Sequence, residues 1–131
     1  MPIKGASQMT YKEILLEKYK KMDSFENVDL FRFDQAGIDE ETPLHIASYR
    51  GDIDDLITML GTNVDVNVRG DIGNTPLHNA ALKKHKEIVL ALLNAGANPT
   101  IRNDYGDSAI DFVMGDDVEN LKAILLSAMG A

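Results

Sequence analysis

The sequence contains three histidines, His45, His78 and His85, which are its best candidates for metal binding or acid–base chemistry. A zinc site needs three or four converging ligands, and His45 and His78 have no evident third ligand beside them. The absence of Cys separately excludes a thiolate zinc site. A catalytic serine would have to lie within hydrogen-bond reach of a base, yet no Gly-x-Ser-x-Gly segment is present. The chain also lacks a P-loop and a Gly-x-Gly-x-x-Gly run. We therefore expect no enzyme, no catalytic residue, no metal and no cofactor.

Carboxylates are abundant, and their excess lies in one part of the chain. The 131 residues carry a formal net charge of −8. Residues 23–55 contain ten acids and two bases, whereas acids and bases balance over the rest. One interpretation is a solvated face; the other is a docking surface for a basic partner, because a patch of one sign raises association rates. The acids that would form this docking surface are Asp39, Glu40, Glu41, Asp52, Asp54 and Asp55.

The composition limits the class of protein further. The length suits a single domain, and 44% hydrophobic with 26% charged residues is typical of a folded chain. The acidic balance disfavours binding to nucleic acid or to an anionic membrane surface. No apolar run approaches the roughly 18 residues that span a bilayer. We expect a cytoplasmic protein that is monomeric when free, with residues 1–9 as a disordered leader.

A short motif recurs at a fixed interval. Thr-Pro-Leu-His at residues 42–45 returns at residues 75–78, which is 33 residues later, and Ser-Ala-Ile-Asp at residues 108–111 is a degenerate third copy. Threonine favours the N-cap of a helix, and proline is tolerated at the first helical position. Each copy therefore predicts the start of a helix.

Two antiparallel helices are expected to follow each motif copy. In the middle unit they are predicted over residues 76–83 and 86–94, with Gly96 as a left-handed stop, a role that Asn63 should play in the first unit. Lys84 stands between the helices where Gly51 stands one unit earlier, and a positive φ at this lysine would cost about 1 kcal/mol. Helices this short are unstable alone and must stack on their neighbours.

The 33-residue period, the Thr-Pro-Leu-His motif and the paired helices resemble the ankyrin repeat family. The resemblance covers about residues 34–131 and implies an all-α repeat solenoid of stacked helix-turn-helix units joined by β-hairpin-like loops. We divide residues 38–131 into units 38–70, 71–103 and 104–131. The last is expected to be a terminal cap with Asp116 and Asp117 in its turn. Its second helix, over about residues 117–128, should bury Val118, Leu121, Ile124 and Leu125.

The segment 10–37 does not fit the repeat. Thr10 and Glu13 form a capping-box pattern that predicts a helix to about Met22. Its apolar side should comprise Ile14, Leu15, Tyr19 and Met22. Phe25, Phe31 and Phe33 follow, and they either close the open end of the solenoid together with the helix or form a partner site.

The resemblance implies a non-catalytic protein–protein interaction module that binds a partner protein through its concave surface. It also implies structural hydrogen bonds for His45 and His78. Carried over by position, the contact strip includes Ile38, Asp71, Asn74, Lys83, Asp104 and Asp107. We predict that partner contact is carried by Tyr49, Arg50, Arg69, Ile72, Leu82, Arg102 and Tyr105. The alternative is an acidic inhibitor or immunity-type protein that neutralises a basic target such as a toxin or nuclease.

Overall fold

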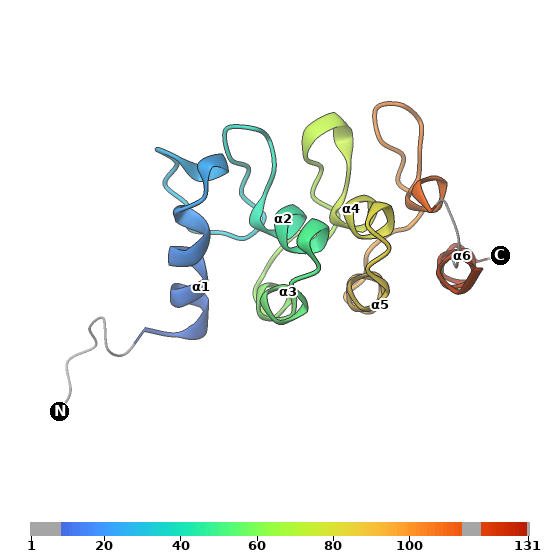
Figure 1. The fold of residues 1–131 in the computed structure, drawn as a ribbon, viewed down its shortest axis with the longest axis horizontal. Helices are drawn as coiled ribbons and strands as arrows, with labels where there is room; N and C mark the ends of the chain where they lie inside the picture. The colour runs from blue at the N-terminus through green and yellow to red at the C-terminus, as the bar shows by residue number, and fades with distance from the viewer. Residues whose placement is uncertain (1–8, 114–118, 131) are drawn as a thin grey trace.

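Helix pairs stacked in a row make up most of the molecule (Figure 1). The computed structural model describes residues 9–113 and 119–130. The two complete pairs are α2 (Pro43–Arg50) with α3 (Ile53–Leu60), and α4 (Pro76–Leu82) with α5 (Lys86–Asn94). A hairpin-shaped loop precedes each pair and projects to the same side of the row, and the described residues contain no regular strand. The predicted all-α solenoid is therefore confirmed.

Threonine fixes the start of each inner helix, α2 and α4. The Thr42 hydroxyl accepts a hydrogen bond from the His45 backbone N–H at 3.2 Å, and Thr75 accepts one from His78 at 3.4 Å. The proline that follows each threonine loses no intrahelical bond, because the first turn of a helix has no such partner. The observed bounds of α5 equal the predicted ones, and α4 ends one residue earlier than predicted.

The turn between paired helices requires a left-handed residue. Gly51 has φ +78° and Lys84 has φ +57°, so the lysine occupies a position that suits glycine. Gly96 has φ +97°, which confirms its predicted role. The same prediction for Asn63 is wrong, since the φ of this residue is not positive. At the end of α3 the Thr62 hydroxyl donates to the Met59 carbonyl at 2.6 Å, and this side chain satisfies a carbonyl that a left-handed residue would otherwise serve.

Helix α1 (Tyr11–Lys20) lies across the N-terminal end of the row, with its axis turned away from those of the stacked helices (Figure 1). The Thr10 hydroxyl accepts from the Glu13 backbone N–H at 3.1 Å, which confirms the predicted N-cap. Tyr19 is fully buried, but Ile14 is 53% exposed. The prediction that Ile14 belongs to the buried side is therefore wrong, because α1 crosses the stack and buries only a narrow stripe.

The aromatic segment after α1 divides between core and surface. Phe25 and Phe33 are buried, as the cap interpretation requires, whereas Phe31 is 60% exposed. Asp34 accepts a hydrogen bond from the Asp65 backbone N–H at 2.7 Å. The same contact returns 33 residues later, where the Asn67 side chain accepts from the N–H of residue 98 at 2.8 Å. The N-terminal segment therefore meets the first unit through a contact of the same kind that joins the first unit to the second.

The C-terminal unit is shortened. Its first helix is a four-residue 3₁₀ helix, η4 (Ala109–Phe112), capped by Ser108, whose hydroxyl donates to Asp111 at 3.2 Å. Its second helix is α6 (Glu119–Ala128). Leu121 and Leu125 are buried as predicted, and Ile124 is half-buried. The predictions for Val118 and for the turn at Asp116 and Asp117 lie outside the described residues.

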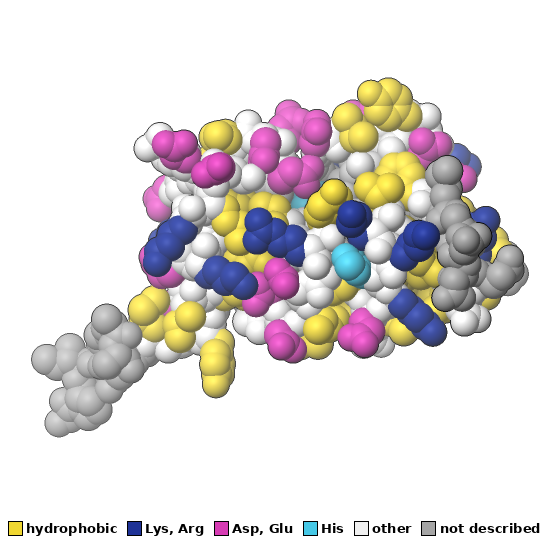
Figure 2. Space-filling model, viewed as in Figure 1, with side chains coloured by type: hydrophobic (Ala, Val, Ile, Leu, Met, Phe, Trp, Pro, Cys, Tyr) yellow, Lys and Arg dark blue, Asp and Glu magenta, His cyan; other side chains and the backbone are white. Residues whose placement is uncertain are grey.

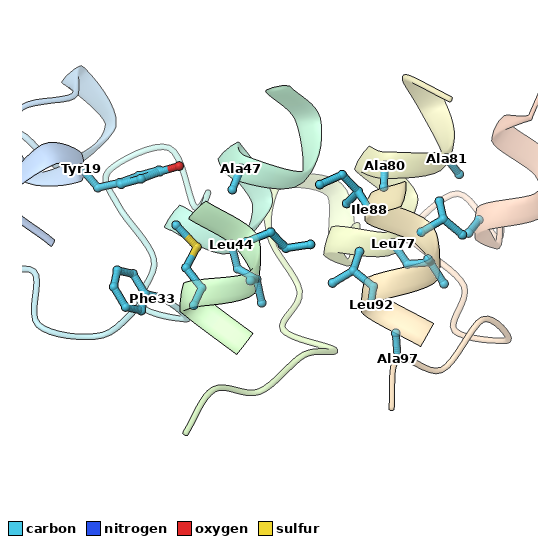
Figure 3. Close-up of a cluster of buried hydrophobic side chains, with 14 of the residues drawn as sticks. Tyr19, Phe33, Leu44, Ala47, Leu77, Ala80, Ala81, Ile88, Leu92 and Ala97 are labelled. Atoms are coloured by element: carbon cyan, nitrogen blue, oxygen red, sulfur yellow. The ribbon is translucent and has the colours of Figure 1, made fainter. Parts of the chain in front are cut away.

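The buried side chains form a line along the stack (Figure 3). The line begins at Tyr19, continues through Leu44 and Leu77 in equivalent positions of successive units, and reaches Leu125. Alanines such as Ala47 and Ala80 lie where inner helices pack against each other, because small side chains let neighbouring helices approach closely. This linear core holds the inner helices and the hairpin loops in a fixed relative position.

Candidate functional site

A groove of about 690 Å³ lies between the hairpin loops and the inner helices α2 and α4. Helix α2 supplies four lining residues, α4 supplies two, the first two hairpin loops supply one each, and the segment after α1 closes one end. The lining consists of Met22, Asp23, Ser24, Glu41, His45, Ile46, Tyr49, Arg50, Asn74, Asn79 and Leu82. The groove therefore joins three parts of the chain that are distant in sequence.

The exposed apolar groups of the groove come from equivalent helix positions. Tyr49 on α2 is 47% exposed, and Leu82, at the same position of the next unit, is 48% exposed. Ile46 lies one helical turn before Tyr49 on the same face of α2. The Lys83 ammonium lies 5.0 Å from the centre of the Tyr49 ring, which fixes a cation beside the tyrosine. Apolar and cationic groups thus share one edge of the groove.

Two buried histidines connect the helices to the hairpin loops. Nδ1 of His45 lies 2.8 Å from the Thr42 hydroxyl, and its Nε2 lies 2.7 Å from the Asn74 carbonyl oxygen. His78 makes the equivalent contacts with Thr75 at 2.9 Å and with the Asp107 carbonyl at 2.8 Å. A carbonyl oxygen only accepts, so Nε2 carries the proton in both rings. The structural role predicted for these histidines agrees with this geometry.

Burial keeps these rings neutral. Removal from water lowers the pKa of His45 to about 4, and it also lowers the pKa of His78. A neutral ring donates through Nε2 and accepts through Nδ1, which are the two roles that the contacts require. The histidines therefore support the groove wall, and their exposed area offers a partner little to contact.

The hairpin loops are also bonded to one another. A Glu41 side-chain oxygen accepts from the Asp71 backbone N–H at 3.1 Å, and the Asn103 amide donates to Asn74 at 2.9 Å. The Ile72 carbonyl accepts from the Asp104 backbone N–H at 2.9 Å. Burial raises the pKa of the Glu41 carboxyl, which is half-buried at the foot of the first loop. Successive loops are thereby held in register before any partner binds.

The two loop arginines bind backbone oxygen atoms. Nη1 of Arg69 donates to the Arg102 carbonyl at 3.0 Å, and Nη1 of Arg102 donates to the Gly106 carbonyl at 2.7 Å. Both side chains remain exposed. The Arg69 guanidinium ties the second hairpin loop to the third, and the Arg102 guanidinium braces its own loop. The sequence reasoning missed these roles, although the 33-residue spacing pointed to an equivalent position.

The residues predicted to contact a partner fall into two sets. Tyr49, Arg50 and Leu82 line the groove. Ile72 and Tyr105 lie on the second and third hairpin loops outside the lining, and they are 36% and 75% exposed. Ile72 has φ +52°, which is unusual for a β-branched residue. Its carbonyl accepts the hydrogen bond from Asp104 on the third loop. Arg69 and Arg102 lie on these loops as well.

The predicted acidic docking residues are divided between two places. Asp39 and Glu40 lie on the first hairpin loop, and Glu41 lines the groove. The remaining three surround the start of α3, in a separate hollow of about 300 Å³. Three of the six carboxylates are already engaged: Asp39 accepts from the Ser24 hydroxyl at 2.7 Å, Glu41 accepts from the Asp71 N–H, and Asp55 pairs with Lys18. Because Asp52, Asp54 and Asp55 line this separate hollow, they do not extend the groove.

Asp55 has an internal role. Its carboxylate pairs with the Lys18 ammonium at 2.7 Å and accepts from the Tyr19 hydroxyl at 3.0 Å. Burial raises the pKa of the Tyr19 phenol, and the Asp55 carboxylate raises it further. This carboxylate joins α1 to α3.

Several lining residues were absent from the sequence prediction. Ile46 and Asn79 occupy one repeat position, a helical turn before Tyr49 and Leu82, so their spacing could have identified them. Met22, Asp23 and Ser24 carry no comparable signal, because their place depends on how the segment after α1 folds back.

Two further properties concern the described residues only. No group of three or more His, Cys, Asp or Glu side chains is placed to hold a metal ion in residues 9–113 and 119–130. No helix in that part of the chain has the length and apolarity needed to cross a membrane.

Comparison with known proteins identifies one family. A family model described as ankyrin repeats, in three copies, matches residues 10–103. The match includes α1 and both complete helix pairs. No curated protein is similar enough in sequence to be counted as a relative.

Proposed function

The chain belongs to the ankyrin repeat family, and from that premise we propose that it binds a partner protein through the groove between its hairpin loops and inner helices. Ankyrin repeats are generally protein–protein interaction modules and are typically non-catalytic. The observation that carries the proposal is the pair Tyr49 and Leu82, two large apolar side chains that are half exposed on a rigid scaffold. Tyrosine and exposed aliphatic groups in a preformed concavity are typical of protein contact sites.

The proposal is tested by comparing variants of matched exposure. Tyr49→Ser combined with Leu82→Ser removes the two large apolar side chains that are half exposed in the groove. Leu90→Ser removes a leucine on α5 that is 44% exposed and lies outside the groove. Wild-type and variant proteins are immobilised, exposed to extract from the native source and compared by quantitative mass spectrometry. We expect a partner that the groove variant loses and the Leu90 variant retains; equal retention by both would contradict the proposal.

The inhibitor alternative rests on the charge of residues 23–55. A basic target would be attracted over long distances, so its association rate should fall steeply as salt rises. An association rate that does not fall with salt would exclude it.

A further inference from the structure

Within the part of the chain that the structure describes, two cations without an ion-pair partner lie beside the exposed apolar side chains Tyr49 and Leu82, although the chain as a whole is acidic. Arg50 lines the groove and has no ion-pair or hydrogen-bond partner among the described residues. The Lys83 ammonium has no ion-pair or hydrogen-bond partner in that part of the chain and lies beside the Tyr49 ring. Figure 2 shows Lys and Arg side chains in a band across the middle of this face, with carboxylates gathered mainly above and below the band.

The carboxylates of the groove are placed differently. Glu41 is half-buried and accepts a hydrogen bond from the Asp71 N–H, so one of its oxygens is already engaged within the protein, and burial raises the pKa of its carboxyl. Asp39, on the same loop, accepts from the Ser24 hydroxyl and from the Glu41 backbone N–H at 3.1 Å. Asp23 is an exposed carboxylate of the lining, and it lies at the end of the groove that is formed by the segment after α1. The exposed apolar pair is therefore flanked by Arg50 and Lys83 on the helix side.

The spacing of these groups defines a repeated subsite. Arg50 and Lys83 occupy the same position in successive units, each directly after Tyr49 or Leu82. Adjacent packed helices lie about 8–10 Å apart, so one short segment of a partner can reach both subsites. Each subsite offers an apolar surface beside a cation that forms no ion pair among the described residues.

Resting on the proposed function, we propose that the groove takes an acidic segment of a partner protein, in which aliphatic or aromatic side chains contact Tyr49 and Leu82 and neighbouring carboxylates pair with Arg50 and Lys83. Arginine favours this role because its planar guanidinium binds a carboxylate through two parallel hydrogen bonds. The net charge of −8 suggests a basic partner, whereas the groove suggests an acidic one. The groove decides the bound contact, because a bound segment meets Arg50 and Lys83 at contact distance and distant charges are screened.

The probe is a random 16-residue peptide library displayed on phage and selected on the immobilised full chain. We expect enriched peptides with Asp or Glu beside large apolar residues. Enriched peptides that are basic, or no enrichment at all, would overturn the proposal. Because this readout concerns the sign of the partner, it can fail while the extract experiment with Tyr49→Ser and Leu82→Ser still identifies a partner.

A charge exchange makes the test specific for the two cations. Binding of the best peptide, measured by fluorescence polarisation, should weaken at least tenfold for Arg50→Glu combined with Lys83→Glu. It should change less than twofold for Lys12→Glu combined with Lys86→Glu, which alters the net charge equally at exposed lysines outside the groove. A peptide whose carboxylates are replaced by Lys should regain affinity for the groove variant.

The results that would contradict the assignment are equal losses in the two variants or failure of the exchanged peptide to bind. Circular dichroism checks that each variant is folded. If the glutamate pair unfolds the chain, Arg50→Gln with Lys83→Gln replaces it, with an expected loss of at least threefold, and an unchanged affinity overturns the proposal.

Discussion

Gly51 and Lys84 occupy the same repeat position. We predict that Lys84→Gly stabilises the protein and that Gly51→Ala destabilises it. Both have positive φ, +78° and +57°. A side chain in this conformation destabilises the folded protein by about 1–2 kcal/mol. Glycine relieves that strain, but its greater conformational entropy stabilises the unfolded chain by about 0.4–1 kcal/mol. Lys84→Gly should therefore raise the free energy of unfolding by about 0.5–1 kcal/mol.

Gly51→Ala should have a larger effect of the opposite sign. A Cβ atom at residue 51 would lie 2.8 Å from Cε1 of His85, so the ring must move. This movement breaks the hydrogen bond from His85 Nε2 to the Tyr49 carbonyl, which is 3.0 Å long and contributes about 1 kcal/mol. Together with the backbone strain, the loss should be about 1–2 kcal/mol.

Urea denaturation followed by far-ultraviolet circular dichroism measures both effects, and a double-mutant cycle isolates the ring contact. In a His85→Ala background the bond is already absent, so Gly51→Ala should cost about 1 kcal/mol less than in the wild type. An equal cost in both backgrounds would show that His85 does not limit the position. Destabilisation by Lys84→Gly would refute the argument from backbone strain.

Further predictions concern the core, the α1–α3 junction and pH. Leu77→Ala should cost about 2–5 kcal/mol in urea denaturation because it opens a buried cavity, whereas Leu82→Ala, at a half-exposed site, should cost less than about 1 kcal/mol. Asp55→Ala should cost about 1–3 kcal/mol, because it leaves a buried tyrosine hydroxyl without its partner; Asp54→Ala, at an exposed neighbour, is the control and should cost less than about 0.5 kcal/mol. The folded pKa of His45, about 4, lies below its unfolded value of 6.5, so its contribution is complete above pH 6.5 and is lost as the pH falls toward 4. The contribution of this histidine to the free energy of unfolding should fall by about 2 kcal/mol between about pH 7 and pH 5, which lowers the urea midpoint. His45→Gln should make the free energy of unfolding less dependent on pH over this range.

The repeat made the fold predictable because local signals and the period agreed. Thr75 and Pro76 marked the start of α4, and Gly96 marked a left-handed position that the structure contains. The two wrong predictions, for Asn63 and Ile14, arose where contacts specific to this chain replaced the expected pattern. At Asn63 a threonine hydroxyl serves the helix end, and at Ile14 the crossing angle of α1 decides which face is buried.

The candidate site was predictable only in part, because side-chain contacts decide which exposed residues are free. Tyr49, Arg50 and Leu82 followed from the repeat position alone. The two loop arginines looked equally suitable, yet their guanidinium groups bond to backbone oxygen atoms of the loops. The period showed that they are equivalent, but it carried no information about what each touches.

The net charge and the charges of the groove should act at different stages of binding, which gives a kinetic prediction. At physiological salt the Debye length is about 8 Å, so the total of −8 acts on a partner mainly during approach at low salt. An acidic partner is repelled during approach, and its association rate should rise as salt screens the repulsion. Its dissociation rate should rise as well, because salt also weakens the pairs with Arg50 and Lys83.

A basic target would show a different pattern. Its association rate should fall as salt rises, because the attraction toward residues 23–55 is screened. Surface plasmon resonance with the partner recovered from extract measures both rates over a salt series. Arg50→Gln with Lys83→Gln should remove the salt dependence of dissociation and leave that of association in place. A fall in the association rate for the wild type would refute an acidic partner, since no local pairing can reverse the long-range sign.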